Sequence, residues 1–437
     1  MSLPRYPKYK ESGVEWLGEV PGHWEVTALK RGFNVTLGKM LQPESNGVDD
    51  ELLPYLRAAN IQWDGVETSD IKQMWLSKRD RAHLRLANGD LLVSEGGDVG
   101  RSCLWAGELE SCYFQNSVNR VRAIGENSNR YLYYWLSTIK DKGYVDVLCN
   151  KSTIAHFTAE KVAAVPVPFP TAVEQTQIAV FLDRETAKID ELVAEQRRLM
   201  ALLKEKRQAV ISHAVTRGLN PDAPLKPSGI EWLGDVPEHW EVLPAKRVSN
   251  VFVPQRNKPD LNADGDGHFW VTMEQMRNEE IKSAELYVTE SAARDAGTRV
   301  LKAGAVVASC VGTFGLAAIN SVDVIINQQL QAFIPTDRVD AKFMRHCVVI
   351  AESYFEQIGT AATIAYVNQL GFANMPLVLP PKAEQHQVVE FLAAESTRFD
   401  ALTTEAQRAI TLLQERRTAL ISAAVTGQID VRGVVAA

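Results

Sequence analysis

An internal repeat constrains this chain more than any other feature. Residues 12–31 read SGVEWLGEVPGHWEVTALKR and residues 228–247 read SGIEWLGDVPEHWEVLPAKR, with fourteen of twenty positions identical at an offset of 216. The match continues, more weakly, to the end of each half, where the offset is 210. The 437 residues therefore form two copies of one unit, as expected for a chain longer than a single core usually supports.

Each unit combines two regions of different composition. One region carries short β-type runs such as DLLVS and AVVAS, glycine clusters and most of the prolines and aromatics, which is typical of a mixed α/β domain. The other, at 174–213 and 384–423, lacks proline and glycine and is rich in helix formers. We therefore expect domains at 1–170 and 221–380, a central helix and linker at 171–220, and a C-terminal helix at 381–437.

The helical regions show a heptad pattern. The apolar seam expected from a 4-3-4-3 spacing comprises Ile178, Leu182, Glu185, Ile189, Leu192, Gln196, Leu199, Leu203, Lys206 and Val210, repeated as Val388, Leu392, Glu395, Phe399, Leu402, Ala406, Ala409, Leu413, Arg416 and Leu420. Residues at this spacing pack against a partner helix. The predicted fold class is α+β, with two heads separated by two helices of about 60 Å that pack as an antiparallel coiled coil with a pseudo-twofold repeat.

Composition narrows the class of protein. Apolar residues make up 46% and charged residues 23%, which is ordinary for a folded soluble protein. No stretch is apolar enough for a membrane span or a signal peptide, so we expect a cytoplasmic protein with no membrane partner. The five cysteines form no Cys-x-x-Cys pair and are expected to be reduced thiols, with no metal site. A net charge of −7 confines any DNA-binding surface to a local patch.

Several motifs occur twice and in the same order. They are the EWLGEVPGHWE and EWLGDVPEHWE openings, the Gly-containing segments 89–100 and 304–315, the segments NKSTIAHFT and GTAATIAYV, and the P-x-P...E-Q-x-Q-I/V-x-x-F-L entry to each helix. In these motifs the chain resembles the specificity subunit of a type I restriction-modification system over essentially its full length.

The resemblance implies a function. The heads would be target recognition domains for a bipartite DNA sequence, and the helices would be conserved spacers. The partners would be double-stranded DNA, two adenine-N6 methyltransferase (modification) subunits and restriction/translocase subunits. No cofactor is expected in this subunit, since S-adenosylmethionine, ATP and Mg would belong to the partner subunits.

The sequence itself favours a chain that is not an enzyme. It contains no Asn/Asp-Pro-Pro-Tyr/Phe methyltransferase loop and no Gly-Lys-Ser/Thr phosphate loop. EGGDVG at 95–100 follows a strand-like run, but its spacing differs from G-x-G-x-x-G and the second copy reads CVGTFG. We therefore favour a tight turn between strands over a phosphate-binding loop. The alternative function is a non-catalytic scaffold whose duplicated heads bind protein.

DNA readout needs polar side chains that reach base edges or phosphates. The candidates are Arg57, Asn60, Gln62, Arg79, Arg81, Arg101, Lys151, Ser152, Thr153 and His156 in the first head, and Arg256, Asn257, Lys258, Gln275, Arg277, Thr313, Thr360 and Thr363 in the second. Each is alternatively a solvated surface residue. Because 40–88 and 250–300 do not align, we expect the two heads to read different half-sites of a non-palindromic target.

Two further sets of repeated residues have open alternatives. The tryptophans and histidines of the repeated opening are either a docking surface or, as we favour, the hydrophobic core and framework of each head; they are Trp16, Trp24, Trp232, Trp240, His23 and His239. Four glutamines at the start of the helices either face a methyltransferase partner or cap the helix; they are Gln175, Gln177, Gln385 and Gln387.

Overall fold

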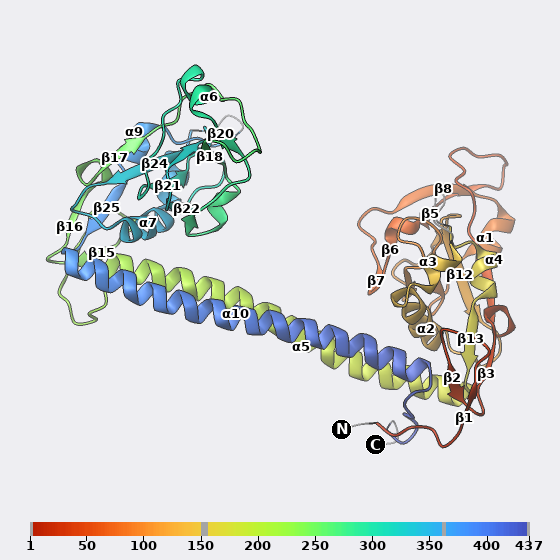
Figure 1. Cartoon of the computed structure of the whole chain (residues 1–437). Coiled ribbons are helices and arrows are strands. Elements are labelled where there is room, and N and C mark those ends of the chain that lie inside the picture. The colour runs from red at the N-terminus through yellow and green to blue at the C-terminus, as the bar shows by residue number, and fades with distance from the viewer. Residues whose placement is uncertain (1–2, 150–155, 361–363, 435–437) are drawn as a thin grey trace. The chain divides into compact units, whose positions relative to one another are not determined.

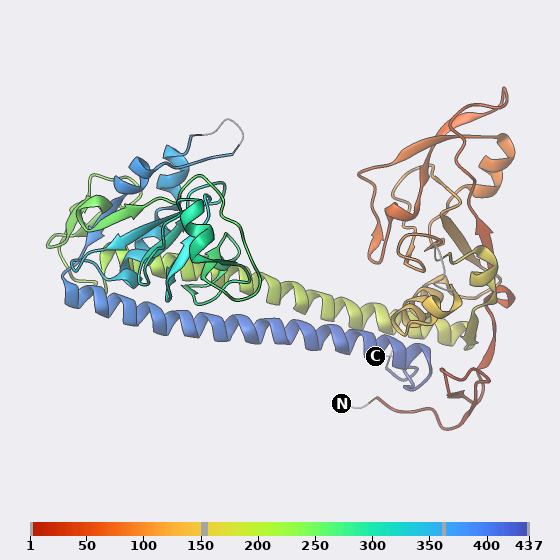
Figure 2. The ribbon, with the colours of Figure 1, turned by 45° about the horizontal axis from the view of Figure 1, so that its top comes forward.

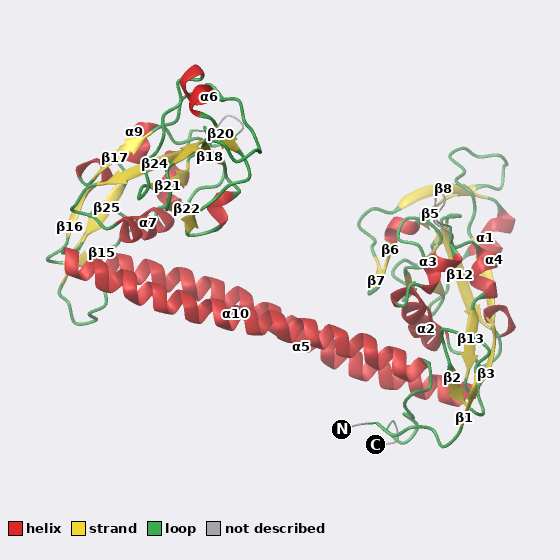
Figure 3. Cartoon of the chain, viewed as in Figure 1, coloured by secondary structure: helices red, strands yellow, loops and turns green. Residues whose placement is uncertain are grey.

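The computed structural model describes residues 3–149, 156–360 and 364–434 (Figure 1). The chain forms two compact units, unit 1 with residues 1–196 and 407–437, and unit 2 with residues 197–406. Each unit contains one head of strands and short helices and one half of each long helix, as the colouring by secondary structure shows (Figure 3). The unit boundary therefore crosses both long helices.

The head of unit 1 is built on a four-stranded antiparallel sheet in the order β10-β9-β12-β4, beside a three-stranded sheet in the order β11-β5-β8. The strands are β4 (Phe33–Leu37), β5 (Glu51–Leu56), β8 (Lys72–Leu76), β9 (Leu91–Ser94), β10 (Ser102–Leu104), β11 (Tyr113–Phe114) and β12 (Val118–Ala123). Three strand pairs complete the head: β1 (Tyr9–Glu11) with β2 (Glu19–Pro21), β3 (Glu25–Ala28) with β13 (Pro166–Phe169), and β6 (Ile61–Gln62) with β7 (Gly65–Val66). The helical elements are η1 (Leu29–Arg31), η2 (Ala58–Asn60), α1 (Lys78–Leu84), α2 (Asn129–Asp141), α3 (Tyr144–Leu148) and α4 (Ala159–Ala164).

The head of unit 2 repeats this topology. Its larger sheet has the order β17-β24-β21-β22-β19 and its smaller sheet the order β20-β18-β23. The strands are β17 (Ser249–Phe252), β18 (His268–Val271), β19 (Glu280–Ile281), β20 (Tyr287–Val288), β21 (Val306–Ser309), β22 (Ala317–Asn320), β23 (Val324–Ile326) and β24 (Leu330–Pro335), with the pairs β14 (Leu225–Pro227) and β15 (Asp235–Pro237), and β16 (Glu241–Pro244) and β25 (Pro376–Leu379). The helical elements are η3 (Ala245–Arg247), η4 (Gln275–Arg277), α6 (Glu290–Asp295), α7 (Ala341–Ile350), α8 (Glu352–Ile358) and α9 (Gln369–Ala373).

The structural repeat includes the segments that do not align in sequence. In unit 1, β5 pairs antiparallel with β8, and Ser77 then caps α1 through its side chain. In unit 2, β18 pairs antiparallel with β20, and Thr289 caps α6 in the same way. A hydroxyl cap and a short strand pair tolerate many sequences, so the fold is repeated where the residues are not.

The two long helices are α5 (Ala172–Arg217) and α10 (Lys382–Val425). Within each unit, their halves lie side by side (Figure 1, Figure 2). In unit 2, Arg207 bonds to both Asp400 and Ser396, while the later residue Ala214 shares a core cluster with the earlier residue Val388. The halves are therefore antiparallel, as predicted. No helix in the described parts of the chain is both long and apolar enough to cross a membrane.

The predicted seam is half wrong. The predicted seam consists of two columns of residues, each repeating every seven positions. The column that contains Ile189, Gln196 and Leu203 faces inward as predicted, but the inward residues of the other column lie one position later in the chain than predicted. Val193 is 8% exposed, whereas Leu192 and Leu199 are 43% and 44% exposed. The inward residues of the second column are Thr186, Val193, Met200, Arg207 and Ala214 in α5, repeated as Ser396, Thr403, Ile410, Arg417 and Ala424 in α10.

The reason for the shift lies at the start of α5. Ile178 and Leu182, from which the heptad count began, belong to the main core cluster of the head, together with Trp24 and Trp135. The step from Leu182 to the next inward residue is again four rather than three. Packing against the head therefore decides which residues face inward in the first turns of α5, and packing against α10 decides this in the later turns.

Candidate nucleic-acid interface

The glycine-containing segments form equivalent loops in the two heads. Residues 95–101 connect β9 to β10, which pair antiparallel, and residues 310–316 connect β21 to β22 in the same way. Gly97 and Gly100 have φ angles of 71° and 83°, which favour glycine. The segment is a turn between strands, as expected, and it does not precede a helix as a phosphate-binding loop does.

In head 1, two neighbouring segments hold the loop through Glu95. The Glu95 amide donates to the Ser117 carbonyl at 2.9 Å, and the Glu95 carbonyl accepts from the Phe157 amide at 3.0 Å. Beneath it, the buried Asn119 side chain donates from Nδ2 to the Phe157 carbonyl at 3.0 Å.

Head 2 reproduces these bonds with other residues. The Cys310 amide donates to the Gln329 carbonyl at 2.9 Å, and the Cys310 carbonyl accepts from the Val367 amide at 3.0 Å. The buried Gln331 side chain donates from Nε2 to the Val367 carbonyl at 2.9 Å. The backbone frame of the loop is therefore the same in both heads, although no residue of this bonding set is identical between them.

The side chains carried by this frame differ in character. In head 1, Glu95 lies 3.9 Å from His156, measured from Oε1 to Nδ1, and partial burial raises the pKa of the Glu95 carboxyl. In head 2, Cys310 and Tyr366 hold the corresponding positions, and burial raises the pKa of the Cys310 thiol to about 11. Of these four residues only His156 was predicted from sequence, although the offsets of 215 and 210 pair Glu95 with Cys310 and His156 with Tyr366.

Four of the predicted head 1 residues meet beside this loop. Arg101 donates from Nη1 to Gln62 Oε1 at 3.1 Å and from Nη2 to the Ala58 carbonyl at 3.3 Å. Arg57 forms an ion pair with Asp70. Asn60 is 2% exposed and its amide bonds to backbone atoms around η2, which makes it a framework residue rather than a reader.

The remaining described candidates of head 1 lie on α1. Arg79 is exposed there. Arg81 forms an ion pair with Glu51 and donates from Nη2 to the Asp49 carbonyl at 2.9 Å. The contacts of α1 are with β8 and β11, so this pair of arginines belongs to the smaller sheet and not to the loop around Arg101.

In head 2, three candidates lie around the equivalent loop. Thr313 is exposed within it, Thr360 donates from Oγ1 to the Tyr366 carbonyl at 3.3 Å, and the Arg256 carbonyl accepts from Gln328 Nε2 at 3.4 Å. Asn257 and Lys258 follow as exposed residues.

The other two described candidates of head 2 lie on η4. Gln275 accepts from the amide of Thr272 at 2.9 Å and so stabilises the turn, whereas Arg277 is exposed. Four further candidates, Lys151, Ser152, Thr153 and Thr363, lie outside the described residues.

The glutamines at the head–helix junction divide into two kinds. Gln175 and Gln385 are 1% and 0% exposed, and their amides are fully used: Gln175 Oε1 accepts from the Ser128 amide at 2.9 Å, and Gln385 Oε1 accepts from the Asp340 amide at 2.8 Å. They tie each helix to its head. Gln177 and Gln387 are half-buried and exposed, respectively, and are the two that remain accessible to a partner.

The repeated tryptophans are core residues, as favoured. Trp24 and Trp240 are 0% and 1% exposed, and each indole Nε1 donates to a glutamate at the start of a long helix, at 3.2 Å and 2.9 Å. His23 and His239 bond to the same glutamates. Trp16 and Trp232 are half-buried and pack against the same head cores as Trp24 and Trp240.

The two heads share one topology, and each is joined to halves of an antiparallel pair of helices. The protein is therefore duplicated, and its two copies hold different loops on the same backbone frame. Comparison with known families gives this class its name. The model of the type I restriction modification DNA specificity domain matches residues 21–198 and again 237–412. The chain belongs to this family, and the resemblance noted in the sequence is confirmed.

Relatives and solved structures agree with this assignment. The chain is 23% identical over 316 residues to the EcoR124I/EcoR124II specificity subunit of Escherichia coli, covering 69% of this chain and 72% of that protein. It is 21% identical to the MjaVIII specificity subunit of Methanocaldococcus jannaschii, covering 98% of both. The fold is similar to the HsdS subunit of Thermoanaerobacter tengcongensis, with a TM-score of 0.56, 16% identity and coverage of 93% and 98%. A chain from the structural work on complex assembly of the type I R-M system gives a TM-score of 0.72, at 14% identity and the same coverage.

Proposed function

We propose that this chain is the non-catalytic DNA-recognition subunit of a type I restriction-modification complex, with each head reading one half of a bipartite target in double-stranded DNA. Family membership supports the general function. The single observation that carries the finer proposal is the pair of loops at 95–101 and 310–316, which share strands and backbone bonds but present different side chains. Different donors and acceptors read different base edges, so the target is asymmetric.

The long helices set the spacing of the half-sites and dock two adenine-N6 methyltransferase subunits. Four exposed leucines support this: Leu192 and Leu412 in unit 1, and Leu202 and Leu402 in unit 2, each at least 43% exposed. The offset of 210 relates Leu192 to Leu402 and Leu202 to Leu412. Single exposed leucines are common. Here, however, each unit carries an equivalent pair, which is what two identical partner subunits, one bound to each unit, would require.

The chemistry belongs to the partners under this proposal. S-adenosylmethionine lies on the methyltransferase subunits, and ATP and Mg lie on restriction/translocase subunits. The net charge of −7 supports weak binding of DNA by the subunit alone. Under the proposal, the assembled complex encloses the duplex.

The test is to express the chain with its methyltransferase subunit and to sequence the methylated bases of the host genome. We expect methylated adenines within one asymmetric, interrupted motif. A symmetric or uninterrupted motif would contradict the proposal. The purified complex should also bind duplex DNA with an affinity that falls as salt concentration rises, whereas a protein-binding scaffold would show no such binding.

A further inference from the structure

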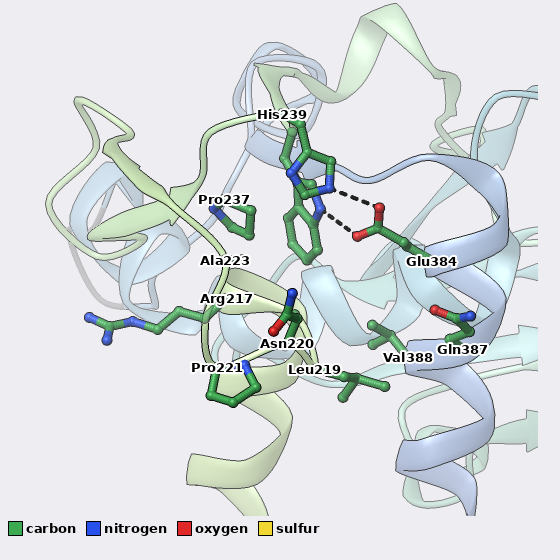
Figure 4. A pocket seen from close by; sticks show the side chains of 12 residues that line it. Arg217, Leu219, Asn220, Pro221, Ala223, Pro237, His239, Glu384, Gln387 and Val388 are labelled. Atoms are coloured by element: carbon green, nitrogen blue, oxygen red, sulfur yellow. Dashed lines mark hydrogen bonds and ion pairs between the residues drawn. The ribbon is translucent and has the colours of Figure 1, made fainter.

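Unit 2 contains a cavity of about 460 Å³ where the head meets the long helices (Figure 4). Its wall combines the linker that follows α5, the turn between β15 and β16, and the first turns of α10. Trp240 and Glu384 line it together with Leu219, Asn220 and Ala223 of the linker.

Glu384 supplies the carboxylate of this cavity, which is also lined by Arg217, Asn220, His239 and Gln387. His239 Nε2 lies 2.8 Å from Oε1, and Trp240 Nε1 donates to Oε2 at 2.9 Å. The Glu384 side chain is nevertheless 37% exposed. A carboxylate offers about four acceptor positions, so Glu384 retains capacity for a further donor on the cavity side.

The repeat shows what such a donor is. In unit 1, Glu174 accepts from His23 and Trp24 in the same way, and in addition the Tyr6 hydroxyl donates to Glu174 Oε1 at 2.7 Å. The guanidinium of Arg432 lies 4.9 Å from the centre of the Tyr6 ring. With these two side chains in place, the Glu174 side chain is only 3% exposed.

The difference arises from chain connectivity. In unit 1, two separate segments cover the glutamate: the N-terminal segment with Tyr6 and the C-terminal segment with Arg432, joined by a 2.8 Å bond from the Asp430 amide to the Pro4 carbonyl. In unit 2, one continuous linker takes both places. In the sequence repeat, Tyr6 corresponds to Asp222 at the offset of 216, and Arg432 corresponds to the same linker residue at the offset of 210.

Asp222 cannot replace either residue. Its carboxylate is exposed, it supplies no hydroxyl and no cation, and ionised it cannot donate to Glu384. The cavity therefore corresponds to the place that Tyr6, backed by Arg432, fills in unit 1, and Glu384 is the carboxylate in its wall that can accept from a hydroxyl. Charged and aromatic groups of this kind are frequent anchors at protein interfaces.

We propose that this cavity receives a tyrosine side chain of the methyltransferase subunit, whose hydroxyl donates to Glu384. The inference rests on the proposed function, because it takes that subunit as the partner. It adds a second anchor to the complex, at the junction of head and helix rather than along the helices.

The test uses the full chain in complex with its methyltransferase subunit. The photo-crosslinking residue p-benzoylphenylalanine is placed at Leu219, which lines the cavity and is 42% exposed. Mass spectrometry should find a cross-link to a methyltransferase peptide that contains tyrosine. Changing that tyrosine to phenylalanine should weaken assembly about tenfold, as expected for a lost hydrogen bond to a charged group.

Variants of this chain provide matched controls. Glu384→Gln should weaken assembly by a similar factor, and Ala223→Trp, which fills the cavity without changing the glutamate, should do the same. Glu390→Gln, an exposed change on the same helix, should have no effect. Thermal unfolding of each free variant shows whether it folds, and the partner's tyrosine variant tests the contact even where a cavity variant does not.

The outcomes separate the two proposals. If the complex assembles and methylates DNA, but Leu219 cross-links to no tyrosine peptide and the variants assemble normally, this inference is overturned and the proposed function stands. If no methyltransferase associates with the unmodified chain, both are overturned.

Discussion

Arg207 of α5 and Asp400 of α10 form an ion pair in unit 2, with 2.6 Å between Nη1 and Oδ1. In unit 1, Arg417 of α10 and Asp190 of α5 form the same pair, with 3.0 Å between Nε and Oδ1. The offset of 210 relates Arg207 to Arg417 and Asp190 to Asp400, so the two ion pairs are equivalent in the repeat. Each arginine occupies the inward column of the seam, so each pair fixes the antiparallel alignment of its own half of the helices.

A double-mutant cycle with Arg207→Ala and Asp400→Ala tests the ion pair. Because the Asp400 side chain is 63% exposed, we expect a coupling free energy of only about 0.5 kcal/mol, falling in high salt. Chemical denaturation of the four proteins measures it. A coupling that does not change with salt would argue that packing rather than charge links the two residues.

The corrected seam predicts opposite behaviour for two adjacent residues. Val193→Asp places a charge at an inward position and should lower the free energy of unfolding by about 2–4 kcal/mol. Leu192→Asp, at a position 43% exposed, should lower it by less than about 1 kcal/mol. Urea denaturation of both variants compares them directly, and a larger effect at Leu192 would restore the register expected from sequence.

The two framework glutamates should differ in their contribution to stability. Glu174→Ala leaves three donors without their acceptor in a buried site and should cost about 2–4 kcal/mol. Glu384→Ala removes two bonds at a site open to solvent, so we expect a loss on the order of 1 kcal/mol. Thermal unfolding of the free subunit provides the measurement, and equal losses would show that Tyr6 does not strengthen the first site.

His346 should make unit 2 sensitive to acid. Burial, together with Arg345 and Arg207, lowers its pKa to about 3, whereas an unfolded histidine titrates near pH 6.5. Between these values the unfolded chain binds a proton that the folded chain excludes, so stability falls as the pH is lowered from about 6.5 towards 3, by up to about 1.4 kcal/mol per unit.

His346→Leu removes this titration. Its free energy of unfolding should therefore fall less than that of the original protein when denaturation at pH 7 is compared with denaturation at pH 5. Parallel losses in the two proteins would place the acid sensitivity elsewhere.

Changes in one head should alter only one half of the DNA motif. Gln62→Ala combined with Arg101→Ala removes a bonded pair beside the head 1 loop, and we expect relaxed base preference in a single half-site, with discrimination reduced by about 1–3 kcal/mol. Methylated-base sequencing gives the motif, and Arg256→Ala in head 2 is the matched change for the other half. Loss of preference in both halves after either change would contradict independent reading.

Some of the site could be found from sequence and some could not. Glycine spacing and the strand-like run LLVS were enough to place the loop at 95–101 between strands. Glu95 was missed because its importance depends on Ser117 and Phe157, which lie far from it in the chain. Asn60 was taken as a reader because it is polar, but a local turn buries it.

The sequence by itself determined that the protein is duplicated, that each unit joins a mixed α/β head to a long helix, and that the heads differ in 40–88 and 250–300. These are properties of repetition and of local preference, which neighbouring residues carry. Tertiary structure alone decided that Val193 rather than Leu192 faces inward, and that Glu174 is covered while Glu384 opens into a cavity. Burial depends on what lies opposite a side chain, and for these residues that is a segment distant in sequence.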